Sequence, residues 1–171
     1  YAEIARTSPK ILNVGFISGR YRAGTGLDHI WPLLMYHGQP SMRVHCYSHN
    51  AFDDAISRRL AGGVANWTDV SEVDDRTAAE IIRNDGIDVL IDLDGHREEG
   101  HPMVIGYKPA PVSLRYLGAL GALEIQGLDG VLGGAACYKG ASDEVALVEG
   151  GLAALSPELN LPGPRPAATA S

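Results

Sequence analysis

One stretch restricts the possible folds of this chain more than any other: residues 81–118, IIRNDGIDVLIDLDGHREEGHPMVIGYKPAPVSLRYLG. Within it, residues 89–93 are apolar on both faces over the length of a strand, as in a parallel strand that helices cover on both sides. Polar groups follow at once, because Asp92, Asp94 and His96 lie where this strand ends. Open α/β sheets bind ligands at the carboxyl ends of their strands, so the stretch predicts a parallel sheet with a polar edge.

The residues before and after this strand repeat a strand-then-helix unit. Apolar runs of strand length predict strands at residues 11–18, 42–47, 66–70, 89–93 and 112–117, with a sixth short strand at 128–132. Apolar spacing and capping residues predict helical segments at residues 28–35, 52–60, 74–84 and 101–107. Either Asp74 or Asp75 caps the third helix, and Gly86 supplies the positive φ that a helix exit commonly needs.

This alternation predicts an α/β fold, a doubly wound, Rossmann-like parallel sheet of five to six strands. We assign it to residues 11–150, after a lead-in of residues 1–10. From Gly118 onward glycine and proline become frequent, which predicts an irregular Gly/Pro-rich extension. Residues 151–171 form its Pro/Ala-rich end and lack a periodic apolar face, so we expect an extended tail that contacts a protein partner. The alternative is a tail that lies on its own domain.

Composition narrows the classes of function. The net charge of −7 argues against nucleic acid as a partner. No apolar run approaches the roughly 18 residues of a membrane helix, so we expect no transmembrane segment. The two cysteines, Cys46 and Cys137, lie far apart and match no metal or redox spacing. We interpret them as buried thiols in a reducing compartment, the cytoplasm.

A glycine- and arginine-containing loop, residues 19–26, follows the first predicted strand. A loop that leads from a strand into a helix is the usual place for a phosphate cradle, although GRYRAGTG matches no standard phosphate motif. The anion-binding candidates are Arg20, Arg22, Gly24 and Gly26. The alternative is an ordinary crossover loop.

The polar edge after residues 89–93 holds a second group of candidates: Asp92, Asp94, His96 and His101. Carboxylate and imidazole groups together suit general acid–base chemistry or metal binding. No zinc spacing fits these residues, so we predict no metal site. The alternative is a set of surface or hydrogen-bonded side chains.

Five blocks of this sequence, in order, carry a family resemblance. They are residues 13–18 (NVGFIS, followed by Tyr21 and Arg22), 44–48 (VHCYS), 79–92 (AEIIRNDGIDVLID), 92–96 (DLDGH) and 108–112 (KPAPV). Together they resemble the amino-terminal catalytic lobe of the O-GlcNAc transferase/SPINDLY glycosyltransferases, which have the two-lobed GT-B fold. The resemblance implies that the sheet is a single GT-B lobe.

The resemblance also implies a reaction and two site residues. Members of the family transfer N-acetylglucosamine or fucose from a nucleotide sugar to Ser or Thr of proteins, so the implied ligand is a nucleotide sugar of the UDP-GlcNAc type. Asp85 matches a carboxylate that the family holds near the catalytic centre, and His96 matches an active-site histidine. We therefore take Asp85 and His96 as catalytic candidates. For Asp85 the alternative is a helix-exit residue that precedes Gly86.

The sequence also departs from the family. The loop after the first strand normally carries a His-Pro pair, and Gly24 and Thr25 stand there. The block W-L-G-Y-P-G-T-[ST]-G is replaced by residues 116–124, YLGALGALE. The lobe that holds the nucleotide in the family is not represented in these 171 residues.

We therefore expect a lobe that is not catalytic alone and acts as a binding or assembly subunit. One alternative is half of a protein O-glycosyltransferase that a carboxyl-terminal lobe completes. Another is a flavodoxin-like domain that binds a ligand with residues 20–26.

Overall fold

The computed structural model describes residues 11–23, 34, 42–50, 54–98, 100–116 and 125–132. The strands are β1 (Leu12–Ser18), β2 (Met42–Ser48), β3 (Asn66–Asp69), β4 (Val89–Asp92), β5 (Val112–Tyr116) and β6 (Gly130–Leu132). The helices are α2 (Ala55–Gly63), α3 (Asp75–Asn84) and α4 (Pro102–Gly106). Each predicted strand is therefore present, with ends that lie within two residues of the predicted ones.

All six strands pair in parallel in the order β3-β2-β1-β4-β5-β6. β1 lies in the centre, where Ile17 is in register with Tyr47 of β2 on one side and with Asp92 of β4 on the other. The chain builds outward from β1 to β3 and then crosses back to build from β4 to β6. The point between β1 and β4 is thus the switch point at which open α/β sheets form a crevice. The predicted doubly wound sheet is confirmed.

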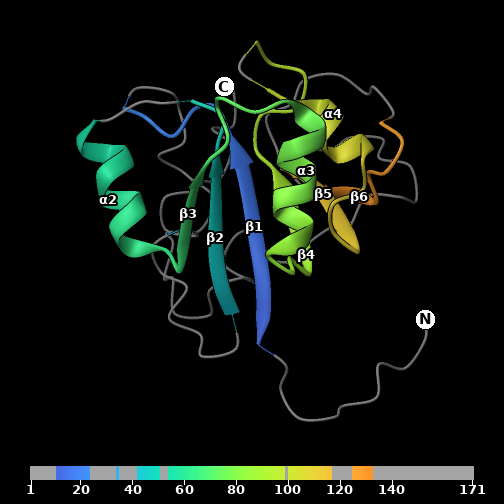
Figure 1. Ribbon diagram of the computed structural model, residues 1–171, viewed down its shortest axis with the longest axis horizontal. Coiled ribbons are helices and arrows are strands. Elements are labelled where there is room, and N and C mark those ends of the chain that lie inside the picture. Colours follow the sequence, from blue (N-terminus) through green and yellow to red (C-terminus); the bar gives the residue numbers. More distant parts are fainter. Residues whose placement is uncertain are drawn as a thin grey trace, which may run out of the picture.

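Two apolar layers cover the sheet, because successive side chains of a strand point to opposite faces. On one face Phe16 packs with Leu60 of α2, and on the other Ile17 packs with Ile82 of α3 and Ile105 of α4. In Figure 1, α3 lies in front of the sheet and α2 lies beyond β3 at the left. The sheet is therefore buried on both faces, which explains why its strands read as continuous apolar runs.

The ends of the helices follow from short polar residues and one glycine. Asp74 caps α3 by accepting a hydrogen bond from the Thr77 amide at 2.7 Å, and Gly86 has a φ of 67° after its end, as predicted. α2 begins at Ala55, later than the predicted start at residue 52. The reason is a capping box, in which Asp54 accepts from the Ser57 amide and the Ser57 hydroxyl accepts from the Asp54 amide.

Several predictions fall on residues outside the described ranges. These are the lead-in, most of the helix at 28–35, Cys137, the block at 116–124 after its first residue, and the tail at 151–171. Cys46 is buried, and burial raises the pKa of its thiol to about 12. In the described part of the chain, none of the helices has both the length and the apolar character needed to cross a membrane.

Candidate functional site

A buried carboxylate, Asp94, is the centre of the polar edge. Its side chain is 1% exposed and lies two residues beyond the end of β4. It accepts hydrogen bonds from the Ser18 hydroxyl at 2.9 Å, from the Gly19 amide at 2.7 Å and from Arg20 Nε at 2.6 Å. All three donors come from the end of β1 and its following loop. Asp94 therefore joins β4 to β1 across the switch point.

Arg20 is turned inward to this carboxylate. Its side chain is 11% exposed, and its Nη2 donates to the Leu93 carbonyl at 3.1 Å. Burial raises the pKa of the Asp94 carboxyl, while the hydrogen bonds from Arg20 and Gly19 oppose that rise. The cation that we predicted as an anion ligand thus compensates a buried charge of the protein itself. An incoming anion would have to compete with Asp94 for it.

The rest of the predicted anion loop is held by neighbouring segments as far as the structure describes it. The Ala23 amide donates to Asp54 Oδ2 at 2.9 Å, which ties the loop to the start of α2. Asn50 Nδ2 donates to the Gly19 carbonyl at 2.9 Å, which ties it to the segment after β2. Arg22 is half-buried, and Gly24 and Gly26 lie outside the described residues. The described half of the loop has the contacts of an ordered crossover.

Asp92, two residues before Asp94, stabilises the turn after β4. Its Oδ1 accepts from the amides of Asp94 and Gly95 at 3.0 and 2.9 Å, which fixes the turn after β4. Its Oδ2 lies 3.6 Å from Arg115 Nε on β5, and both side chains are almost fully buried. Such a pair is in ion-pair range but beyond hydrogen-bond range.

His96 is exposed in the loop that follows this turn. The loop is compact, because the Gly100 amide donates to the Arg97 carbonyl at 2.9 Å and a Cβ on Gly100 would lie 2.2 Å from the Gly95 carbonyl oxygen. The carboxyl edge thus presents the imidazole of His96 to solvent, where a second lobe or a ligand can reach it.

Asp85, the other catalytic candidate, lies at the opposite end of the sheet. It caps the carboxyl end of α3, and the Gly86 carbonyl beside it accepts from Asn13 Nδ2 near the start of β1. Tyr47 donates its hydroxyl to Asp85 Oδ2 at 2.8 Å. Asp85, taken with His96 as a catalytic candidate, therefore lies away from the polar edge, because α3 runs antiparallel to the strands and its end lies at their amino ends. Asp85 and His96 do not share a site within the described residues.

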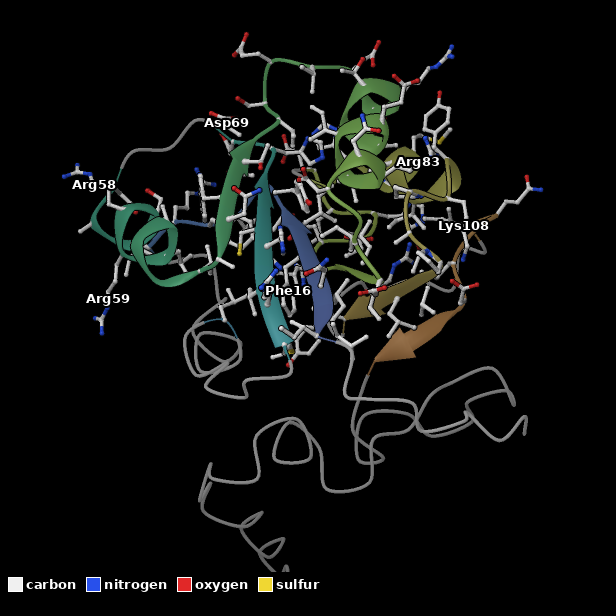
Figure 2. All side chains as sticks on the ribbon, turned by 60° about the horizontal axis from the view of Figure 1, so that its bottom comes forward. Phe16, Arg58, Arg59, Asp69, Arg83 and Lys108 are labelled. Carbon is white, nitrogen blue, oxygen red and sulfur yellow. The ribbon has the colours of Figure 1, made fainter. Side chains whose placement is uncertain are left out.

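A histidine pair at the polar edge was missed in the sequence. His49 follows β2 directly, and its ring stacks on that of His101 with centroids 3.6 Å apart and planes 14° apart. His101 Nδ1 lies 2.9 Å from Asp75 Oδ1, at the start of α3. In Figure 2, Asp69 at the end of β3 marks the same edge of the sheet, while Arg58 and Arg59 extend from α2 away from it. The available signal was a histidine two residues after a predicted strand.

His101 was predicted to lie with Asp92, Asp94 and His96, whereas its described partners are His49 and Asp75. Among the residues that the structure describes, no three or more histidine, cysteine or acidic side chains are arranged to hold a metal ion.

Comparison with known proteins gives a consistent set of relatives. The family model of glycosyl transferase family 41 matches residues 1–133. The Petunia hybrida protein named "Probable UDP-N-acetylglucosamine--peptide N-acetylglucosaminyltransferase SPINDLY" is 29% identical over 113 residues, which are 63% of this chain and 12% of that protein. An Arabidopsis thaliana protein with the same name ending in SEC is 28% identical over 111 residues, 64% of this chain and 11% of its own length.

One solved structure extends the comparison to three dimensions. It is a mutant of the Thermobaculum terrenum O-GlcNAc transferase, with a TM-score of 0.70 and 30% identity. The match covers 74% of this chain and 25% of the solved chain. The sequence thus corresponds to about a quarter of the solved chain and about an eighth of the curated relatives.

Proposed function

Because this chain belongs to glycosyl transferase family 41, we propose that it is a lobe of that family that does not transfer sugar by itself and serves as a binding or assembly subunit of a larger complex. The observation that carries the proposal is the ion pair between Arg20 and Asp94. In this pair the central carboxylate at the switch point and the nearest predicted anion-binding cation bind each other.

Sugar transfer from a nucleotide sugar makes two electrostatic demands. A base must have an accessible lone pair for the acceptor hydroxyl, and a preorganised donor must stabilise the leaving diphosphate. Asp94 is 1% exposed and already accepts from three donors, so it is a poor base. Arg20 is held by Asp94 and the Leu93 carbonyl, so it is a poor ligand for a diphosphate. Neither Asp94 nor Arg20 meets these demands, so the proposal assigns them to other groups.

The alternative proposal is half of a protein O-glycosyltransferase, with a donor of the UDP-GlcNAc type, Ser or Thr as acceptor and a carboxyl-terminal lobe that completes the site. The TM-score of 0.70 against an O-GlcNAc transferase supports it, because the backbone fold resembles part of that transferase. In that arrangement His96, exposed at the carboxyl edge, is the candidate that faces the cleft. Asp85 has no part in it.

For the larger complex we propose a protein partner that contacts residues 151–171 in the cytoplasm. The low apolar periodicity and high proline content of this tail support a partner-bound segment. The buried, unpaired thiol of Cys46 supports a reducing compartment.

The test uses the 171-residue chain, first alone and then mixed with the nucleotide-binding lobe of a family 41 relative. Calorimetric titration with UDP-GlcNAc and a transfer assay on acceptor peptides should show neither micromolar binding nor transfer by the chain alone. Transfer by the isolated chain overturns the proposal. Transfer only in the mixture supports the alternative, and it should then fall in His96→Gln while Asp85→Asn, its matched control at the other end of the sheet, retains it.

A further inference from the structure

Three elements meet at the stacked histidines. His49 extends from the end of β2, His101 is the residue before α4, and Asp75 is the first residue of α3. The stack of 3.6 Å between ring centroids is close and nearly parallel, and the Asp75 carboxylate fixes one ring through His101 Nδ1 at 2.9 Å. The contact therefore depends on the charge state of two imidazoles whose faces touch.

The two rings differ in their hydrogen-bond partners. His101 Nδ1 has the Asp75 carboxylate in hydrogen-bond range. His49 Nε2 is buried with no hydrogen-bond partner, so a proton there has no acceptor. It would also place a positive charge against the ring of His101. The stack therefore disfavours a charged His49.

We propose that the His49–His101 stack is a proton-sensitive latch: neutral His49 holds residues 95–98 and 100–101 and the start of α4 against the carboxyl edge of the sheet, and protonation of His49 releases them. This device is separate from the proposed function, but it acts on the loop that carries His96.

Burial, more than the charged surroundings, favours the neutral form of His49. Burial and the neighbouring His101 lower the pKa of His49 to about 4, although Asp75 on α3 and Asp69 on β3 oppose that shift. A histidine with a lowered pKa in the fold binds fewer protons there than in the opened state, whose ordinary value is about 6.5. The closed state is therefore favoured fully above pH 6.5 and loses that advantage as the pH falls from 6.5 toward 4.

The element to be released is short. α4 has five residues, and the side chain of His101 makes no capping hydrogen bond to it. Its inner side is held by buried Val104 and Ile105. Local opening is expected first where short elements depend on few contacts. The loop and the first turn of α4 fit that description.

The test measures amide protection in the whole chain by hydrogen exchange between pH 7 and pH 4. In the wild-type chain, protection of residues 100–107 should fall by up to about tenfold per pH unit below pH 6, as expected for uptake of one proton. In His49→Phe, which keeps an aromatic ring on His101 but cannot be protonated, protection of the same residues should not follow pH over this range. His96→Gln, which removes a nearby exposed histidine, should behave as the wild type.

Retention of the full pH dependence in His49→Phe, or a flat profile in the wild type, overturns the proposal. If His49→Phe fails to fold, the imidazole of His49 can be titrated by NMR in the wild type and in His101→Gln. Removal of His101 should raise the pKa of His49, and an unchanged value of about 6.5 in both chains would exclude the latch.

Discussion

Arg20 and Asp94 are separated by 74 positions in the chain, yet Arg20 Nε lies 2.6 Å from Asp94 Oδ1 at the switch point of the sheet. The pair links the loop after the central strand β1 to the turn after β4. The pair therefore connects the two halves of a doubly wound fold and stabilises their contact, at the place where such folds usually have an open crevice.

Asp94→Asn should destabilise the fold strongly. The change leaves the guanidinium of Arg20 buried without its counter-ion, which typically costs about 3–5 kcal/mol. Urea unfolding followed by circular dichroism measures the loss. The exposed pair of Arg76 and Glu80 on α3 gives the control, since Arg76→Gln there should cost less than about 1 kcal/mol. Equal effects of the two changes would mean that the Arg20–Asp94 pair does not stabilise the contact between the two halves of the sheet.

Tyr47→Phe should show that Asp85 has a structural role. The Tyr47 hydroxyl donates to Asp85 at 2.8 Å in a partly buried environment. Burial is the largest cause that raises the pKa of Tyr47, and this hydrogen bond is the next. Loss of a hydrogen bond to a charged group costs about 1.5–3 kcal/mol in the free energy of unfolding. Tyr107→Phe, at an exposed tyrosine, is the matched control and should be nearly neutral. An unchanged midpoint in Tyr47→Phe would contradict the role.

Two glycine-to-alanine changes should have opposite signs. Gly62 lies in α2 with open space around its missing Cβ, so Gly62→Ala should stabilise the chain by about 0.5–1 kcal/mol. Gly100→Ala places a methyl group 2.2 Å from the Gly95 carbonyl oxygen, and backbone must move to relieve it. Overpacking of this kind costs about 1–3 kcal/mol. Thermal unfolding of both variants is the measurement, and a stabilised Gly100→Ala would show that the loop of His96 is not compact.

Acid should weaken the helix caps in a window below that of His49. Hydrogen bonds from the amides of Ala23 and Ser57 lower the pKa of Asp54, and those from the Thr77 amide and side chain lower the pKa of Asp74. A lowered carboxyl pKa contributes stability that is complete above about pH 4 and is lost as the pH falls through the native value. Unfolding midpoints of Asp54→Asn and Asp74→Asn between pH 7 and pH 2.5 should therefore show a shallower acid slope than wild type. A wild-type slope in both variants would contradict this assignment.

Local patterns predicted the elements because their causes are local. The strand at residues 89–93 follows from a continuous apolar run, and α3 follows from a capping aspartate and from Gly86. No local sequence pattern predicts the pairing of Arg20 with Asp94, because the loop after β1 has no periodicity that would fix the direction of a side chain. The place of Asp85 was derivable, since a residue between a helix and the next parallel strand lies at the amino edge.

The two outermost strands in the described part of the sheet are short, with four residues in β3 and three in β6. An edge this short offers few main-chain donors and acceptors to a strand from another molecule, and natural sheets use short edges to limit such templating. We therefore expect a partner of this lobe to bind its side chains and loops. Extension of the sheet by a strand from another subunit is disfavoured at both edges.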